Sequence, residues 1–450
     1  MAARSATSRT RRRQARSTKG AVGPEAGTAA GRTTRWAMFA LFLVIVVTPF
    51  VFDPASRDAF RLPKALFAQT AILASLFLLA LGWRDPEVYR RLLRSEALRA
   101  VGPLVLFGTA ISLLSRHPEH VHRALVGFWI GFAALWGWSV GFRRGQLARA
   151  LDWMTWPAAL LAAVAILQFH DLFQPFRFET LAQSSRLAIT SFAGNAGDLA
   201  AFLVLPALVA QRAIARKGFA VWPAAVLALS FYGIAITQTF AALSALAVGS
   251  AVLWWPVLPV RRRVLALSAF VATVLLALAV AAPFRARAER KVTALVQGDW
   301  NRVLTGRLDG WRTGAWMLSE HPFAGVGLGA YRAEFVRAKQ ALLDRGVPFF
   351  PEQGNVVFAN AHNEVIEVGA ELGIGGLLLL AWAVVEIVKR TRSLERGEEG
   401  REALADRGFA WAALAALVVL SLSHFPFRIA LVSSQAFLLL AWIFAREEST

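Results

Sequence analysis

The sequence predicts an all-α polytopic membrane protein with about 12 transmembrane helices and one long outer loop that carries amphipathic helices. Hydrophobic residues make up 56% of the 450 residues, more than in an ordinary soluble domain. They form blocks of about 17 to 22 residues with few charges, the length at which a helix crosses a bilayer. Lys and Arg are also distributed unevenly between alternate loops, as in proteins with several spans.

Twelve apolar segments follow one another, nine before the long loop and three after it. They lie near residues 36–52, 65–82, 100–114, 124–141, 153–169, 192–210, 219–236, 240–256, 264–283, 365–388, 408–423 and 429–445. They divide the chain into a basic tail (1–35), helices 1–9 (36–283), the long loop (284–361) and helices 10–12 (362–445).

The charges of the loops predict the orientation. With the N-terminus inside, the inner loops hold twenty Lys and Arg residues and the short outer loops hold eight. This asymmetry predicts that both termini are cytoplasmic. The Ser/Arg-rich tail has no apolar periodicity, so we expect it to be disordered. The net charge of +20 fits this topology, and we expect contact with membrane lipid and not with nucleic acid.

Several chemistries are excluded by what the chain lacks. Its Cys count is 0, which excludes disulfides, thiolate zinc sites, iron–sulfur clusters and cysteine nucleophiles. The sequence contains no HExxH, Walker A or DxD motif. The GVGLGAYR stretch at 325–332 lacks the strand–helix unit of a dinucleotide fold, so we interpret it as a tight turn. We expect neither a metal nor a cofactor.

The long loop shows helical patterning. In RLDGWRTGAWMLSEHP, the residues Leu308, Trp311, Ala315 and Leu318 form an apolar stripe, and Pro322 ends the helix. A second amphipathic helix is predicted in AYRAEFVRAKQALLDRG.

A polar stretch, AHNEVIEVGAELGIGG, stands at the start of the tenth span. We predict Asn360 as the N-cap, with His362 and Asn363 in the first turn, where the free N–H groups favour anions. Two interpretations stay open for His362. It either completes the helix end at the interface, or it is a neutral imidazole that accepts a proton from an incoming hydroxyl.

Three carboxylates follow on one face of that helix, Glu364, Glu367 and Glu371. Acids at this depth should face the bundle and be paired or hydrated. They form ion pairs with Arg side chains of neighbouring helices, or they orient His362 and bind sugar hydroxyls. The sequence does not choose between the two.

Arginines accompany these groups in two other outer segments. Arg307 and Arg312 lie in the long loop, and Arg186 precedes the sixth span, which begins with Asn195 and Asp198. The planar guanidinium group suits phosphate oxygens, so two such residues could clamp a diphosphate. The alternative for each is simple solvation. The site as a whole suits a reaction between a membrane-anchored phosphorylated donor and a hydroxyl acceptor.

These motifs resemble the O-antigen ligase / O-antigen polymerase superfamily. The resemblance is most specific across 307–376, the core motif region, where an Arg precedes a helix, a Pro, G-x-G, H-N-x-x-x-E and E-x-G-x-x-G. It implies a metal-independent, inverting glycosyltransferase of the type C class in the bacterial inner membrane, active on the periplasmic face. The donor would be a glycan linked to undecaprenyl diphosphate.

The resemblance also implies roles. Arg186, Arg307 and Arg312 would hold the diphosphate. His362 would activate the acceptor hydroxyl or stabilise the transition state, with Arg307 as the second catalytic residue. The family's GNPN element reads GNAG at 194–197, and its Ser-Arg pair reads Thr239-Phe240, which predicts an altered donor site or an arginine supplied from elsewhere.

The acceptor stays open between lipid A–core, the growing glycan and a protein hydroxyl. The activity is accordingly that of a ligase, a polymerase or a protein O-oligosaccharyltransferase. The alternative from another class is a secondary transporter, whose buried acids and His would bind protons or substrate.

Overall fold

The computed structural model of the chain describes residues 29–56, 58–176, 189–256, 258–259, 261, 282–350, 357–394 and 400–446. Every regular element in these ranges is a helix, and no strand occurs in them. The predicted all-α fold is therefore confirmed for the described part of the chain.

The helices come in three groups along the chain. The first group contains α2 (Ala29–Phe42), α3 (Arg61–Gly82), α4 (Pro86–Leu93), α5 (Glu96–Ser112), α6 (Pro118–Gly141), α7 (Arg144–Trp153), α8 (Thr155–Phe169), α9 (Ala196–Lys217), α10 (Val221–Ile236) and α11 (Phe240–Trp254). The second group contains α13 (Ala282–Val296), α14 (Trp300–Val303), α15 (Arg307–Glu320) and α16 (Tyr331–Asp344). The third group contains α17 (Glu364–Ser393), α18 (Arg401–Ser421) and α19 (Ala430–Phe444). Short turns are η1 (Leu43–Val47), η2 (Thr48–Phe50), η4 (Ser191–Ala193) and η7 (Pro426–Arg428).

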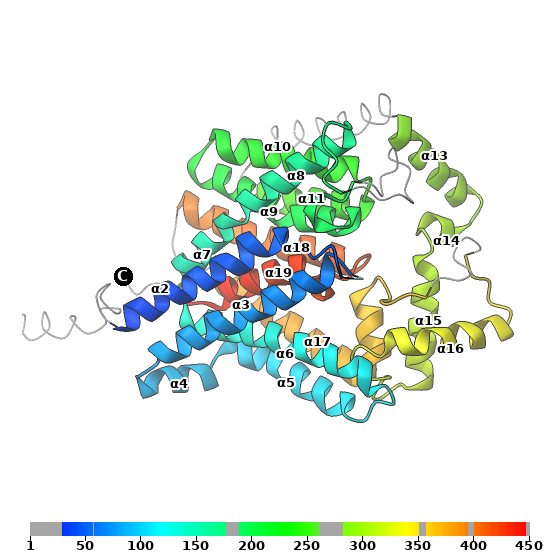
Figure 1. Cartoon of the computed structure of the whole chain (residues 1–450), viewed down its shortest axis with the longest axis horizontal. Helices are drawn as coiled ribbons and strands as arrows, with labels where there is room; N and C mark the ends of the chain where they lie inside the picture. The colour runs from blue at the N-terminus through cyan, green and yellow to red at the C-terminus, as the bar shows by residue number, and fades with distance from the viewer. Residues whose placement is uncertain are drawn as a thin grey trace, which may run out of the picture.

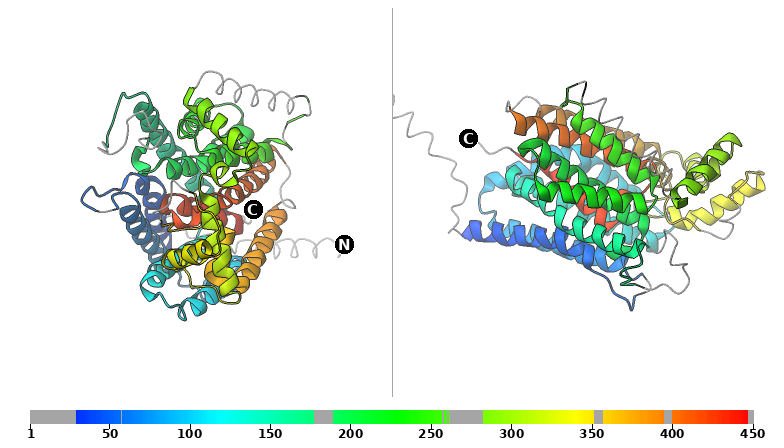
Figure 2. Two further views of the ribbon diagram at one scale, coloured as in Figure 1. Left: turned by 90° about the vertical axis from the view of Figure 1, so that its right-hand side faces the viewer. Right: turned by 90° about the horizontal axis from the view of Figure 1, so that it is seen from above.

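The long helices of the first and third groups run side by side in one bundle, and the second group lies at one end of it (Figure 1). Two further views show the same arrangement, with α15 and α16 projecting beyond the bundle (Figure 2). The beginning of α2 and the end of α19 lie at the opposite end. The predicted loop helices are thus gathered on one side, away from both chain ends. Which side faces the cytoplasm stays a prediction.

Among the described residues, seven segments are long and apolar enough to cross a membrane. They are Gly31–Phe50, Arg61–Gly82, Pro118–Gly141, Arg144–Phe169, Ala196–Lys217, Glu364–Ser393 and Arg401–Ser421. The helices α10, α11 and α19 are shorter but apolar, and α5 coincides with the predicted segment 100–114. The predicted segment 264–283 lies almost entirely outside the described residues. The total of twelve spans therefore stays a prediction.

The helix α9 forms the centre of the bundle. The helices α8, α10, α11 and α18 pack around it, and 89% of its apolar window is buried. Ala, Leu and Val occupy every side of α9, as expected for a helix with no solvent-facing stripe. Its first turn carries the buried Asp198, so the core helix presents a carboxylate at the end of the bundle nearest to α13–α16.

The buried face of α15 differs from the predicted stripe. Gly310, Thr313, Gly314 and Met317 are buried, whereas Ala315 is exposed. The glycines explain the difference, because they let α15 approach the start of α17 more closely than larger residues would allow. A Cβ at Gly310 would lie 3.0 Å from the backbone oxygen of Ala361. The close approach brings the beginning of α15 next to the residue that precedes His362.

The GVGLG stretch is the tight turn that the sequence predicts. It docks against a kink in α17, where Gly373 has φ 65° and ψ −163°. The backbone N–H groups of Val326 and Gly327 donate to the carbonyls of Ala370 (3.0 Å) and Glu371 (2.9 Å). The kink leaves these carbonyls without their helical partners, so the turn satisfies them. The turn therefore links the outer helices to the span that follows the site.

Replacing Gly325 by alanine should destabilise this link. Gly325 has φ +62°, and a Cβ there would lie 2.3 Å from the backbone carbon of Glu371, so the variant combines strain with a backbone collision. Gly346 has φ +74° with open space around it. Gly346→Ala should therefore lose only about 1 kcal/mol of stability, the loss that an alanine incurs in the left-handed conformation. Thermal unfolding in detergent should show at least twice that loss for Gly325→Ala. Equal losses would contradict the docking.

Candidate active site

His362 lies in a tight loop directly before α17. The side chain of Asn363 caps this helix, because its Oδ1 accepts hydrogen bonds from the backbone N–H groups of Val365 (3.0 Å) and Ile366 (3.2 Å). The prediction that Asn360 is the N-cap is therefore wrong, and His362 precedes the helix instead of lying in its first turn. His362 has φ 55°, which residues other than glycine rarely adopt. The fold thus holds His362 in a left-handed conformation just before the helix.

Aromatic rings surround the imidazole of His362. Its ring centre lies 5.7 Å from that of Phe358 and 4.9 Å from that of Phe425. Among the described residues, its buried Nδ1 has no hydrogen-bond partner. One ring nitrogen is therefore available to a hydroxyl group of a ligand.

Burial, and then the charges of Arg307, His424 and Arg61, lower the pKa of His362 to about 3. The imidazole is consequently neutral at physiological pH and can accept a proton. The same interactions show that Arg307 lies within electrostatic range of His362. The structure therefore brings together the two residues that the sequence nominates for catalysis.

Two of the three predicted carboxylates contact Arg428, which lies in η7 just before α19. Its Nη2 pairs with Glu371 and lies 3.2 Å from Oε1 of Glu367. Glu364 instead accepts a hydrogen bond from the backbone N–H of Phe427 (3.1 Å). The ion-pair interpretation thus holds for Glu367 and Glu371, with an arginine from beside a neighbouring helix.

Glu367 has a further contact with the loop that carries His362. Its Oε1 accepts from the side-chain amide of Asn360 (2.8 Å), and its Oε2 accepts from the backbone N–H of Ala361 (2.9 Å). Asn363 donates from Nδ2 to the carbonyl of Leu422 (3.2 Å). The loop is therefore fixed on both sides of His362.

The two loop arginines have different surroundings. Arg307 opens α15, and its Nη1 donates to the carbonyl of Leu304 (3.2 Å). Arg312 lies one turn further along and donates from Nη1 to the carbonyl of Pro348 (2.6 Å). Arg307 acts electrostatically on His362 and His424.

The predicted elements before the sixth span are partly visible. Arg186 lies outside the described residues. Asn195 caps α9, because its Oδ1 accepts from the backbone N–H groups of Gly197 (2.7 Å) and Asp198 (3.3 Å). Asn195 therefore supports the position of Asp198.

Three residues near His362 were not predicted to belong to the site: Arg61, Asp198 and His424. Arg61 forms a two-pronged ion pair with Asp198, with distances of 2.8 Å from Nε to Oδ2 and 3.1 Å from Nη2 to Oδ1. His424 lies with its Nε2 3.7 Å from Oδ1 of Asp198, and its ring contacts Phe425 at 4.6 Å. The sequence signals were the charged DAFR stretch in the first outer loop and the HFPF stretch between the last two spans.

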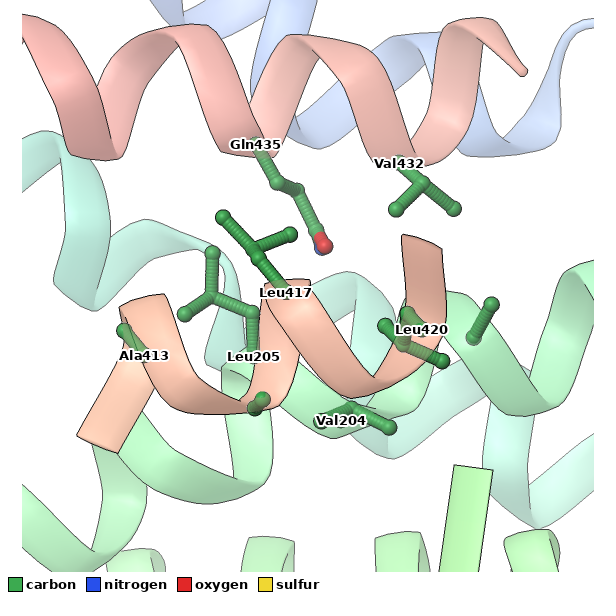
Figure 3. Close-up of a pocket in the computed structure, with 9 residues that line it drawn as sticks. Val204, Leu205, Ala413, Leu417, Leu420, Val432 and Gln435 are labelled. Atoms are coloured by element: carbon green, nitrogen blue, oxygen red, sulfur yellow. The ribbon is translucent and has the colours of Figure 1, made fainter. Parts of the chain in front are cut away.

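A separate cavity lies inside the bundle between α9, α18 and α19 (Figure 3). Its lining is apolar apart from the amide of Gln435, so it offers no acid, base or cation. Across the described ranges, no group of three His, Cys, Asp or Glu side chains is arranged to hold a metal ion. The polar groups of the bundle end are therefore the candidate site.

Fold and site together define an all-helical membrane protein with a His–Arg cluster at one end of its bundle. Residues 224–381 match the family model described as O-antigen ligase, and these residues include both His362 and Arg307. The match covers less than half of the chain. It supports a relationship to the O-antigen ligase superfamily, as the motifs of the chain indicate, and a glycosyltransferase-like enzyme. No curated protein matches the chain.

Proposed function

We propose that this protein transfers a glycan from undecaprenyl diphosphate to a hydroxyl acceptor, as an O-antigen ligase or polymerase. The observation that carries the proposal is the half-buried imidazole of His362, whose pKa is lowered by burial and by the charge of Arg307, inside the region that matches the family model. In this proposal the site faces the periplasm of the bacterial inner membrane, and both chain ends are cytoplasmic.

The proposed chemistry is a direct displacement at the anomeric carbon of the donor. His362 accepts the proton of the acceptor hydroxyl while the acceptor oxygen attacks. The bond from the anomeric carbon to the diphosphate oxygen breaks, and the electron pair leaves with the undecaprenyl diphosphate. Attack opposite the leaving group inverts the anomeric configuration. Arg307 stabilises the charge on the leaving diphosphate without a metal ion.

The contacts of the site favour this role over transport. The charged and imidazole groups gather at one end of the bundle, next to α15. A transporter is expected to place its binding groups near the membrane midplane, at broken helices. Arg186 remains in the proposal as a donor-binding residue. Arg312 is expected to support the donor site indirectly, by holding the segment around Pro348 through its hydrogen bond to the carbonyl of that residue.

The first experiment is a gel profile of surface glycans in a strain that lacks this protein. The strain is complemented with wild type, His362→Ala, Arg307→Ala or the control Arg116→Ala, at matched membrane levels. Arg116 is an exposed arginine between α5 and α6, at the same end of the bundle. We expect wild type and Arg116→Ala to restore the glycan, and both site variants to fail.

The pattern that remains in the deletion strain distinguishes the activities. Accumulated lipid-linked polymer indicates a ligase with lipid A–core as the acceptor, and lipopolysaccharide with a single repeat indicates a polymerase. Loss of protein glycans alone indicates a protein O-oligosaccharyltransferase. Full restoration by both His362→Ala and Arg307→Ala would refute the proposed site.

A further inference from the structure

Arg61 stands where the first outer loop meets the beginning of α3. Its Nε and Nη2 bind the two oxygens of Asp198, a carboxylate that is only 1% exposed. The side chain of Arg61 itself is 47% exposed. Asp198 therefore holds one edge of the guanidinium group, and the opposite edge faces outward with its remaining donors.

The ring of Phe425 connects Arg61 with both histidines. The guanidinium carbon of Arg61 lies 5.6 Å from the centre of this ring. The ring centres of His362 and His424 lie at 4.9 Å and 4.6 Å from the same point. Three chemically active side chains from three distant parts of the chain are thus packed around one phenylalanine.

The charges around this ring favour an anion. Burial, and then the charges of Arg307 and Arg61, lower the pKa of His424 to about 3. The charges of the same two arginines also help to lower the pKa of His362. Both arginines therefore act on the same pair of imidazoles. Asp198 and the exposed Asp58, whose Oδ1 accepts from the backbone N–H of Arg61 (2.9 Å), offset two positive charges. The neighbouring Lys64 adds one positive charge, so one cation stays in excess among these groups.

Arg61 and Arg307 come from distant parts of the chain. Arg61 is the first residue of α3, and Arg307 is the first residue of α15. Only Arg307 lies in the region that matches the family model, so the match assigns nothing to Arg61, Asp198 or His424. Because both arginines act on the same pair of imidazoles, each could hold one phosphate group of a diphosphate.

We propose that Arg61, held by Asp198, is a second binding residue for the diphosphate of the donor, acting together with Arg307 beside the two histidines. This inference rests on the proposed function, because it assigns a residue to the same donor. It supplies an arginine from the start of α3 to a donor site that lacks the basic residue of the family's Ser-Arg pair, which reads Thr239-Phe240 here.

The test is the binding of undecaprenyl diphosphate to the purified full-length protein in detergent, compared with undecaprenyl monophosphate. Arg61→Ala should weaken binding of the diphosphate by about 10- to 100-fold, as expected for a lost charge-assisted contact. Arg116→Ala, with the same change of charge at the same end of the bundle, should leave it unchanged. Undecaprenyl monophosphate should lose less affinity than the diphosphate, because Arg307 can hold its single phosphate.

Arg61→Ala also leaves Asp198 buried without its cation, so a second pair of variants is needed. Asp198→Asn and Arg61→Ala/Asp198→Asn both lack the buried charge. If Arg61 binds the donor, the double variant binds about 10-fold more weakly than Asp198→Asn. Equal affinities would show that Arg61 only neutralises Asp198, which overturns the inference and leaves the proposed function intact. If folded wild type fails to bind undecaprenyl diphosphate, the proposed function falls, and the inference falls with it.

Discussion

Replacing His362 by alanine should reduce glycan transfer by about 10²- to 10⁴-fold, the usual contribution of a positioned general base. Binding of undecaprenyl diphosphate should change little, because the arginines and not the imidazole carry the charge that the diphosphate needs. The variant is expected to fold, since the buried Nδ1 of His362 has no hydrogen-bond partner to lose among the described residues. Single-turnover transfer and donor binding on the same purified sample separate the two effects.

His122→Ala is the matched control. His122 is exposed, and its Nδ1 contacts the carbonyl of Pro118 within α6, so both transfer and binding should match wild type. If His362→Ala weakened donor binding as much as it slowed transfer, His362 would be a binding residue and the general-base role would be wrong.

The pH dependence offers a second readout of the same role. The pKa of His362 is lowered to about 3, below the ordinary value of about 6.5. The neutral form therefore stabilises the fold above about pH 6.5, and this contribution is lost as the pH falls towards 3. An NMR titration of the empty protein should show no protonation of His362 between about pH 5 and 8. A bound diphosphate should raise its pKa by offsetting the charges of Arg307 and Arg61, which brings the base closer to its working range.

The sequence predicts the bundle well because its main signals are local. Apolar blocks give each span by length alone, and the helices at 196–217 and 364–393 coincide with such blocks. The packing of α15 against α17 was harder to predict from the sequence. A search for an apolar stripe selects Ala315, whereas the contact is made by Gly310 and Gly314. Glycines have no side chain to signal burial, so close approach of two helices leaves little trace in hydrophobic periodicity.

The site residues also divide into those with a local sequence signal and those brought in by distant parts of the chain. His362 and Arg307 are recognisable because their motifs are contiguous, and the turn at 325–329 is predicted from glycine spacing. Arg61 and His424 reach the site through the folding of spans far apart in the chain. No local pattern reports that Asp198 of one helix pairs with Arg61 of another. Asn360 was chosen as the cap for its residue type, but Asn363 is one residue before the helix and reaches its free N–H groups.

Replacing Arg428 by alanine should cost about 3–5 kcal/mol of unfolding free energy, the typical loss when one partner of a buried ion pair is removed. Glu367 is 0% exposed and Glu371 is 1% exposed, and both contact Arg428. Without its cation this pair of acids must be protonated or hydrated at the beginning of α17. Denaturant unfolding in detergent measures the loss. Arg345→Ala is the control, because Arg345 and Glu320 form an exposed pair at 3.8 Å, worth at most about 1 kcal/mol.

A triple variant separates the charge from the shape of this cluster. Arg428→Met with Glu367→Gln and Glu371→Gln removes all three charges at similar volume, and such replacements are often neutral for stability. We expect its stability to recover while glycan transfer stays low. The reason is that Glu367 accepts from both Asn360 and the backbone N–H of Ala361, and a glutamine has only one oxygen to offer. The loop before His362 would then lose one of its two anchors to α17. Recovery of both stability and transfer would show that these carboxylates only neutralise Arg428 and do not position the base.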